Sequence, residues 1–368
     1  MERLSGGRAM VKRLVICCDG TWNTPDETTG DGLPCPTNVT KVALAVAGED
    51  DGGVEQRIFY HPGVGTKRSE RIRGGAFGYG LSRNVRDTYR FIVENFEPGD
   101  ELFLFGFSRG AFTARSVVGL VRNSGVLKPR HVGRLDEAYA LYRSRTAHPR
   151  GVEATLFRRS WSWETRIHFI GVWDTVGALG IPLAVPWAAL VNRRWAFHDT
   201  QLSSHVDNAF QALAIDEQRQ PFVATLWERQ ESAARQRVEQ VWFSGVHSDV
   251  GGGYADASLA DVPLLWLVDR ARQCGLAFED DAFQGIVTSR EGPAGADIKV
   301  APDALGPAHQ SRTGYYRLLP PLHRQLGTAD REREYVASSA LRRWEEVTDY
   351  APGNLGAYLD KHHHVMDV

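Results

Sequence analysis

The chain of 368 residues is 42% hydrophobic, which suffices for the core of one large domain or two smaller ones and excludes a disordered or fibrous protein. Its 43 Lys and Arg residues nearly balance its 45 Asp and Glu residues, and the formal net charge is -2. This excludes the general basic field of a nucleic-acid-binding protein, so we expect no nucleic-acid partner. The four cysteines have neither C-x-x-C spacing nor the density of a disulfide scaffold, which predicts a reduced compartment.

No apolar run has the length of a secretion signal or a membrane span. The run at residues 14–18 is too short for the apolar part of a signal peptide. The run at residues 181–191 has eleven residues and two prolines, whereas a span needs roughly 20 residues. We therefore predict a soluble, cytoplasmic protein, and the sequence carries no indication of its oligomeric state.

Short apolar runs alternate with amphipathic stretches, a pattern typical of an α/β protein with a mainly parallel sheet and helices on both faces. Helical spacing predicts one helix with Val85 on its buried face and another that begins after Gly110. A third helix is predicted from the spacing of Phe210, Leu213 and Ala214. The clearest predicted strands are residues 13–18, 57–61, 101–107, 166–173 and 239–246.

The alternation weakens near residue 275. Residues 291–310 read as loop, and only residues 338–347 again have a helical pattern. We therefore predict a core at residues 11–275 and a C-terminal extension at residues 276–368, an appendage or cap packed on that core.

The first predicted strand ends in CCDGTWN, which is close to the D-x-D-G-T motif of haloacid-dehalogenase phosphatases. Cys17 stands where that motif has its nucleophilic aspartate, so the phosphatase interpretation lacks its nucleophile. Two interpretations stay open for the turn. In the first, the Asp19 side chain stabilises a simple glycine turn by a hydrogen bond. In the second, the turn directs a backbone N–H of Gly20 or Thr21 at a substrate oxyanion.

Ser108 lies in the stretch GFSRGAF, at the predicted corner between a strand and a helix. The G-x-S-x-G pattern is typical of a nucleophile elbow, in which Gly106 and Gly110 let the strand and helix backbones approach closely. The Arg109 amide, at the start of the helix, is a candidate oxyanion donor. An ordinary tight turn is the alternative for this stretch.

Two further loops follow predicted strands in the order expected of a Ser-Asp-His triad. Asp174 comes directly after the strand at residues 166–173, and His247 follows the strand at residues 239–246. In such a triad His247 takes the Ser108 proton and Asp174 orients the imidazole. Asp249 is the alternative acid, or holds the histidine loop.

The sequence thus predicts an α/β-hydrolase-like three-layer fold that acts as a serine ester hydrolase without metal or cofactor. One alternative is a metal-assisted phosphoester hydrolase with Asp19, His247 and Asp249 as ligands. Another is a non-catalytic binding module on the same fold. Residues 177–195 follow Asp174 and carry no charge from 177 to 191, so they form either an inner wall or a cap that contacts lipid.

Six stretches, in order, carry a family resemblance: VICCDGTWN, YHPGVGT, GFSRGAFTAR, GVWDTVGALG, LAIDEQRQPF and WFSGVHSDVGGGY. Together they closely resemble the type VI secretion phospholipase effector-like catalytic domain, over roughly residues 11–275. The resemblance implies an α/β-hydrolase fold with Ser108 as nucleophile, Asp174 as acid and His247 as base. It also implies a phospholipid or other acyl-ester substrate, peripheral membrane contact, and export as an effector.

Overall fold

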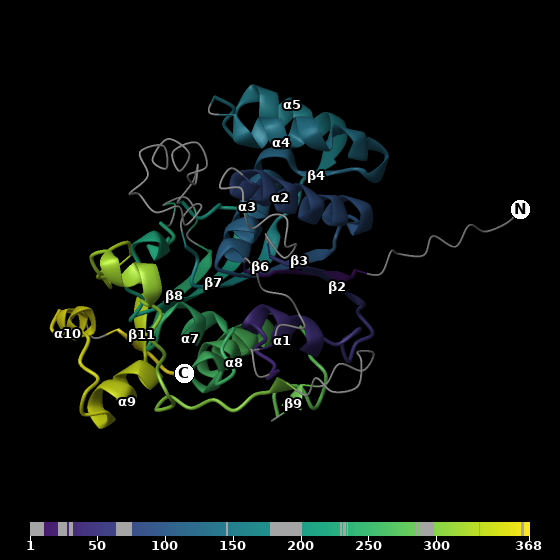
Figure 1. Ribbon diagram of the computed structural model, residues 1–368. Coiled ribbons are helices and arrows are strands. Elements are labelled where there is room, and N and C mark those ends of the chain that lie inside the picture. Colours follow the sequence, from purple (N-terminus) through teal and green to yellow (C-terminus); the bar gives the residue numbers. More distant parts are fainter. Residues whose placement is uncertain are drawn as a thin grey trace, which may run out of the picture.

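The computed structural model describes most of the chain (Figure 1). The described residues are 11–20, 28, 32–63, 76–144, 146–176, 201–228, 230, 233, 235–284, 286–287, 298–330, 332–361 and 364–368.

An eight-stranded sheet runs through the middle of the molecule (Figure 1), in the strand order β12-β11-β8-β7-β6-β3-β1-β2. Each neighbouring pair in it is parallel, which confirms the predicted α/β class with a mainly parallel sheet. Its strands are β1 (Arg13–Cys18), β2 (Gln56–His61), β3 (Glu101–Phe107), β6 (Ile167–Trp173), β7 (Val206–Ala214), β8 (Arg237–Phe243), β11 (Glu334–Ala337) and β12 (Val365–Met366).

Helices cover both faces of this sheet, so the fold has three layers and is α/β-hydrolase-like (Figure 1). One face carries α1 (Asn38–Ala45), α7 (His247–Gly251), α8 (Ser258–Gln273) and α9 (Ser338–Glu346), and the other carries α2 (Ala76–Asn95), α3 (Arg109–Ser124), α4 (Leu135–Arg143) and α5 (Val152–Trp161). The remaining elements are α10 (Gly353–Leu359), the short strands β4 (Val126–Leu127), β5 (Ser162–Trp163), β9 (Ile286–Val287) and β10 (Ile298–Lys299), and the 3-10 turns η1 (Pro129–Arg134), η2 (Gln220–Phe222) and η3 (Gly314–Leu318).

The core consists of two hydrophobic clusters, one on each face of the sheet. Strand β1 contributes to both, because Val15 and Cys17 belong to one cluster while Leu14 and Ile16 belong to the other. A strand that is buried on both faces reads as a continuous apolar run, which explains why the sequence pattern located β1 and β3 at their observed bounds.

The helix predicted from Phe210, Leu213 and Ala214 is wrong, because these residues belong to strand β7. Strand β7 lies between β6 and β8, and its second half is buried on both sides. In such a strand most positions on both faces are apolar, as in the second half of β7 where only Gln211 is polar, so helical spacing arises without a helix.

The last quarter of the chain shares the sheet and core of the first part. Strand β11 pairs with β8, and Val336 and Ala337 are buried in the same cluster as Val15. The helix predicted at residues 338–347 is confirmed as α9. Residues after 275 therefore extend the sheet, in addition to packing against it.

Strand order reverses next to β1, which has β2 on one side and β3 on the other. Ligands of open parallel sheets bind in the crevice that such a reversal leaves outside the carboxyl ends of the strands. Ser108 follows β3 and Asp19 follows β1, so both lie at this edge of the sheet.

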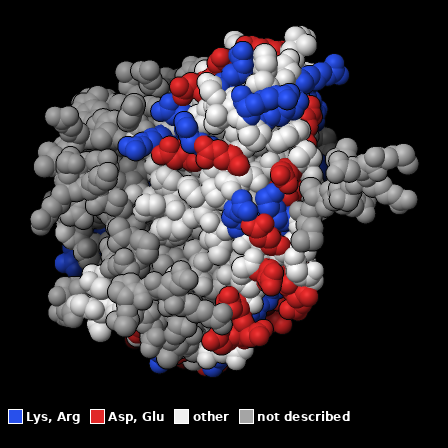
Figure 2. All heavy atoms as spheres, turned by 90° about the vertical axis from the view of Figure 1, so that its right-hand side faces the viewer, with Lys and Arg blue, Asp and Glu red and all other residues white. Residues whose placement is uncertain are grey.

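On the face of the molecule that Figure 2 shows, lysine and arginine side chains are interspersed with aspartate and glutamate, and acidic side chains gather toward the lower end. The described residues there offer no continuous basic surface of the kind that nucleic acids require. None of the described helices has the length and apolar character of a membrane span.

Candidate active site

Ser108 stands between β3 and α3 in a backbone conformation that ordinary residues avoid, with φ 57° and ψ -120°. The predicted strand-to-helix corner is confirmed. A Cβ at Gly106 would lie 2.7 Å from the Cα of Ala111, and a Cβ at Gly110 would overlap the carbonyl oxygen of Cys18. Both positions therefore require glycine for the close approach of the backbones.

Asp174 directly follows β6 and is fully buried. Its backbone also has a positive φ, 37°, and its N–H donates to the carbonyl oxygen of Ala212 in β7. The carboxylate accepts a hydrogen bond from the N–H of Ala214 through Oδ1, at 3.0 Å. The end of β7 thus fixes the direction of the Asp174 side chain.

His247 is the first residue of the short helix α7, which follows β8. Its Nε2 lies 2.8 Å from Ser108 Oγ, and its Nδ1 lies 2.5 Å from Asp174 Oδ2. The imidazole is held between the rings of Phe107 and Phe222, with centroids at 4.6 and 4.9 Å. The three residues that the sequence picked from three separate strand ends therefore form one chain of hydrogen bonds.

Arg324, from the C-terminal extension, also binds the Asp174 carboxylate and was missed by the sequence analysis. Its Nη1 donates to Oδ1 at 2.6 Å and its Nη2 to Oδ2 at 3.0 Å. The same guanidinium donates to the carbonyl oxygens of Ala214 and Phe222. No local pattern marks this arginine, because it lies in a stretch without regular structure; only a buried aspartate's need for a positive partner hints that one exists.

The surroundings of Asp174 and His247 set the charge of both side chains. Burial alone would raise the pKa of Asp174, but the charge of Arg324 and the contact with His247 outweigh it and hold this pKa well below its usual value. Burial lowers the pKa of His247 below its usual value, although Asp174 acts in the opposite direction. At neutral pH the arrangement is therefore an ionised carboxylate, a neutral imidazole and a hydroxyl.

Asp249, the alternative acid, binds a different histidine. Its Oδ1 lies 2.6 Å from Nδ1 of His309, and its Oδ2 accepts hydrogen bonds from the N–H groups of Val246 and His309. The ring of His309 stacks on Tyr254. Asp249 thus holds the loop that carries His247, the second of the two roles that the sequence left open.

Glu217, in the stretch LAIDEQRQPF, binds the backbone of His247. Its Oε2 accepts a hydrogen bond from the backbone N–H of His247 at 3.3 Å and pairs with Arg219 at 2.8 Å. Burial would raise the pKa of Glu217, but Arg219 outweighs it and the pKa is lowered. The sequence flagged this stretch only through family resemblance and gave Glu217 no role.

The Asp19 side chain stabilises its own glycine turn, which is the first of the two interpretations of this stretch. The N–H of Gly20 donates to Asp19 Oδ1 at 2.6 Å, so the prediction that this N–H binds an oxyanion is corrected. The other carboxylate oxygen accepts hydrogen bonds from Thr37, Thr40 and Tyr60. A buried carboxylate needs these donors, and the nearest backbone N–H is one of them. Thr21, the other predicted donor, lies outside the described residues.

The ligand set of the metal-assisted alternative is not brought together. Asp19 binds hydroxyl groups, Asp249 binds His309, and His247 lies between Ser108 and Asp174. Within the part of the chain that the structure describes, no group of three or more His, Cys, Asp or Glu side chains is arranged to hold a metal ion. The predicted wall or cap at residues 177–195 lies outside the described residues.

Three known proteins are similar to parts of this chain. The uncharacterized protein YEL023C of Saccharomyces cerevisiae is 28% identical over 236 residues, 57% of this chain and 32% of the yeast protein. The crystal structure of an uncharacterized protein from Pseudomonas aeruginosa has a TM-score of 0.47 at 18% identity, over 74% of this chain and 47% of that one. The structure of the Tle1 effector bound to the VgrG spike from the type 6 secretion system has a TM-score of 0.34 at 19% identity, over 67% of this chain and 52% of that one.

This chain thus spans about a third of the yeast relative and about half of each solved chain. The family described as "T6SS, Phospholipase effector Tle1-like, catalytic domain" matches residues 12–270. These residues include Ser108, Asp174 and His247, and the predicted resemblance is confirmed. The chain belongs to the family of Tle1-like phospholipase effector catalytic domains.

Proposed function

We propose that this protein is a serine ester hydrolase that cleaves acyl esters of phospholipids through Ser108, His247 and Asp174. The observation that carries the proposal is the unbroken chain of hydrogen bonds from Ser108 Oγ through both imidazole nitrogens to the buried carboxylate. A serine hydroxyl is a weak nucleophile, and this chain supplies the base and the group that orients it. The family supports a phospholipid as the substrate.

In the proposed reaction, Ser108 Oγ attacks the ester carbonyl carbon while its proton passes to His247 Nε2. The tetrahedral intermediate collapses to an acyl-enzyme, and the imidazolium protonates the departing alcohol. A water molecule then gives a proton to His247 and attacks the acyl group, which releases the fatty acid and restores the Ser108 hydroxyl. Asp174 stays ionised throughout and stabilises the imidazolium.

The oxyanion is proposed to lie at the N-terminus of α3. Arg109 is the first residue of this helix, where backbone N–H groups point out of the helix and favour negative charge. The positive φ of Ser108 supports this role, because nucleophile elbows turn the chain sharply so that the hydroxyl and the following amide face the same substrate group. Thr21 remains the predicted second donor.

Arg324 is proposed as a positioning residue. Its two hydrogen bonds fix the carboxylate plane of Asp174, and its charge keeps that carboxylate ionised after burial. It does not touch the substrate in this proposal. It acts through Asp174 on the tautomer and orientation of His247.

Mass spectrometry after treatment with a fluorophosphonate tests the proposal. We expect one covalent adduct, on Ser108, together with loss of hydrolysis of a short soluble ester. Ser108→Ala should remove both adduct and hydrolysis, whereas Ser116→Ala, a buried serine two turns along the same helix, should keep both. Equal hydrolysis by the wild type and Ser108→Ala would reject the serine mechanism, and an unreactive Ser108 would favour a binding module.

A further inference from the structure

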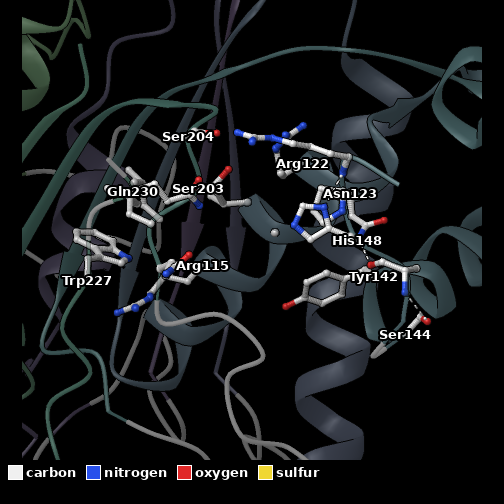
Figure 3. A pocket seen from close by; sticks show the side chains of 18 of the residues that line it. Arg115, Arg122, Asn123, Tyr142, Ser144, His148, Ser203, Ser204, Trp227 and Gln230 are labelled. Carbon is white, nitrogen blue, oxygen red and sulfur yellow. Dashed lines mark hydrogen bonds between the residues drawn. The ribbon is translucent and has the colours of Figure 1, made fainter. Parts of the chain in front are cut away.

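A cavity of about 530 Å³ lies alongside α3, away from the proposed triad (Figure 3). Arg122, His148 and Tyr142 form one wall of it, and Arg115 and Trp227 form the other. Arg122 lies on α3 fourteen residues beyond Ser108, about 21 Å along the helix axis, and Arg115 lies seven residues beyond it, about 10 Å. None of the proposed triad residues is among the described lining residues, so the cavity is distinct from the Ser108 site. Its volume lies within the range of small-ligand sites, roughly 300 to 1,000 Å³.

Two of its arginines have no ionic partner among the residues that the structure describes. The guanidinium groups of Arg122 and Arg150 form neither a hydrogen bond nor an ion pair with any residue that the structure describes. Arg115, by contrast, donates to the carbonyl oxygen of Thr225 at 2.6 Å and lies over the Trp227 ring. Arg115 is therefore a fixed part of the wall, while Arg122 and Arg150 present their charge to the cavity.

Positive charge accumulates on this side of the molecule. Burial, with the nearby charges of Arg158 and Arg150, lowers the pKa of Arg122, although the charge of Glu164 acts in the opposite direction. Burial, together with Arg122 and Arg166, lowers the pKa of His205 to about 4. An anion in the cavity would offset this mutual repulsion, so the local electrostatics favour a ligand with negative charge.

The rest of the lining suits hydroxyl groups. The Tyr142 hydroxyl points into the space between the two walls (Figure 3), and Ser144, Ser203 and Ser204 also line the cavity. Asn123 is buried, and its side-chain oxygen has no hydrogen-bond partner among the described residues. A buried acceptor without a donor is costly, and a hydroxyl group of a ligand would satisfy it.

We propose that this cavity binds a phosphate ester of a small polyol. The phosphate lies against Arg122 and Arg150, whose planar groups match phosphate oxygens, and a polyol hydroxyl donates to Asn123 Oδ1. The same chemistry is offered by a free polyol phosphate and by the glycerophosphate headgroup of a lipid. The proposal concerns binding and does not depend on the chemistry of Ser108.

Calorimetric titration of the Ser108→Ala protein tests it, because that protein should not turn a ligand over. The probes are glycerol 3-phosphate, inorganic phosphate and, as the uncharged control, glycerol. Vesicles of phosphatidylglycerol, compared with phosphatidylcholine in a sedimentation assay, test the lipid source. Each measurement is repeated with Arg122→Gln, Arg150→Gln and Asn123→Ala. Arg342→Gln, an exposed arginine of α9 on the opposite side of the sheet, is the charge-matched control (Figure 1).

We expect glycerol 3-phosphate to bind, each arginine variant to weaken binding about tenfold or more, and Arg342→Gln to leave it unchanged. Asn123→Ala should weaken the binding of glycerol 3-phosphate and leave the binding of inorganic phosphate unchanged. Binding of phosphatidylglycerol vesicles alone, lost in the arginine variants, would support the same site with a lipid as source. The proposal is overturned if neither source binds, or if arginine variants with wild-type melting temperatures bind as tightly as the parent.

Discussion

The beginning and the later turns of α3 differ in how their polar groups are satisfied. At Ser108 each group of the proposed triad has a fixed partner, and the chain of partners continues through Asp174 to Arg324. Beside the later turns, neither Arg122 nor Arg150 nor the side-chain oxygen of Asn123 has a partner within the described chain. A group that is held in place before the substrate arrives is suited to chemistry, whereas an unsatisfied group is suited to binding.

The difference also extends to the backbone. The proposed triad concentrates strain, with positive φ at Ser108 in the elbow and at Asp174 after β6, and such strain persists only where the surrounding structure over-determines it. The cavity wall on α3 is regular helix. Four predictions test the contrast, from the largest expected effect to the smallest.

Asp174→Asn should lower kcat/KM for a short soluble ester by about 10⁴-fold, because an amide at this position favours the wrong tautomer of His247. Asp249→Asn should cause a far smaller loss, since Asp249 binds His309 and not the imidazole of His247. Steady-state kinetics of the two matched variants measure the difference. If Asp249→Asn is the more damaging variant, the assignment of the acid is reversed.

Arg324→Gln should lower the free energy of unfolding by about 3 to 5 kcal/mol, because it leaves the buried Asp174 carboxylate without its charged partner. The pKa of Asp174 is depressed in the folded protein, so this stabilisation is present above about pH 4 and fades as the pH falls below it. Urea denaturation at several pH values measures both effects. Arg324→Lys, which keeps the charge, should lower the free energy of unfolding by less than Arg324→Gln does. If both variants lose the same stability at every pH, Arg324 has a packing role only.

Gly110→Ala should destabilise the protein by about 3 kcal/mol, because the added methyl group overlaps the backbone carbonyl of Cys18, which cannot move away. Gly119→Ala is the matched change beside the cavity. Its methyl group meets Cε2 of Tyr142 at 2.8 Å, a side chain that can shift, and helix propensity favours alanine by about 1 kcal/mol. The melting temperature should fall clearly more in Gly110→Ala than in Gly119→Ala. Equal falls in melting temperature would contradict the contrast between the elbow and the cavity.

The acid limb of the kcat/KM profile should have its midpoint below about pH 6.5, because burial lowers the pKa of His247 and the neutral imidazole is the base. Glu217 raises this pKa and Arg219 lowers it. Glu217→Gln should therefore move the midpoint to lower pH, and Arg219→Gln to higher pH, each by less than about one unit. Shifts of the same sign in both variants would show that the two charges do not act on His247 directly.

Much of the site was open to prediction because its residues occupy positions that parallel sheets make special. Ser108, Asp174 and His247 each follow an apolar run, and the carboxyl ends of parallel strands meet at one edge. Strand β7 was missed because full burial removes the alternation that distinguishes strand from helix. The partner of the Gly20 N–H could not be assigned from sequence, since two acceptors were open to it and only the folded structure shows Asp19 as its partner.

Arg324 was beyond prediction for a different reason. It lies 150 residues from Asp174 in the sequence, and nothing in its neighbours indicates which carboxylate it joins. Sequence patterns report local structure and strand ends, whereas a long-range ion pair depends on where an irregular segment returns to the core.

The position of Arg324 late in the chain has a consequence for synthesis. A ribosome that has translated residues 1–275 has made Ser108, Asp174 and His247, but neither Arg324 nor strand β11, which covers the edge of β8. In that nascent chain Asp174 lacks its positive partner and the sheet has an unpaired edge. Because translation proceeds from the N-terminus, Asp174 gains this partner only after Arg324 has been made. Under the proposed function, the cell that makes this protein is exposed to a lipid-cleaving site with a paired acid only after Arg324 and β11 have emerged from the ribosome.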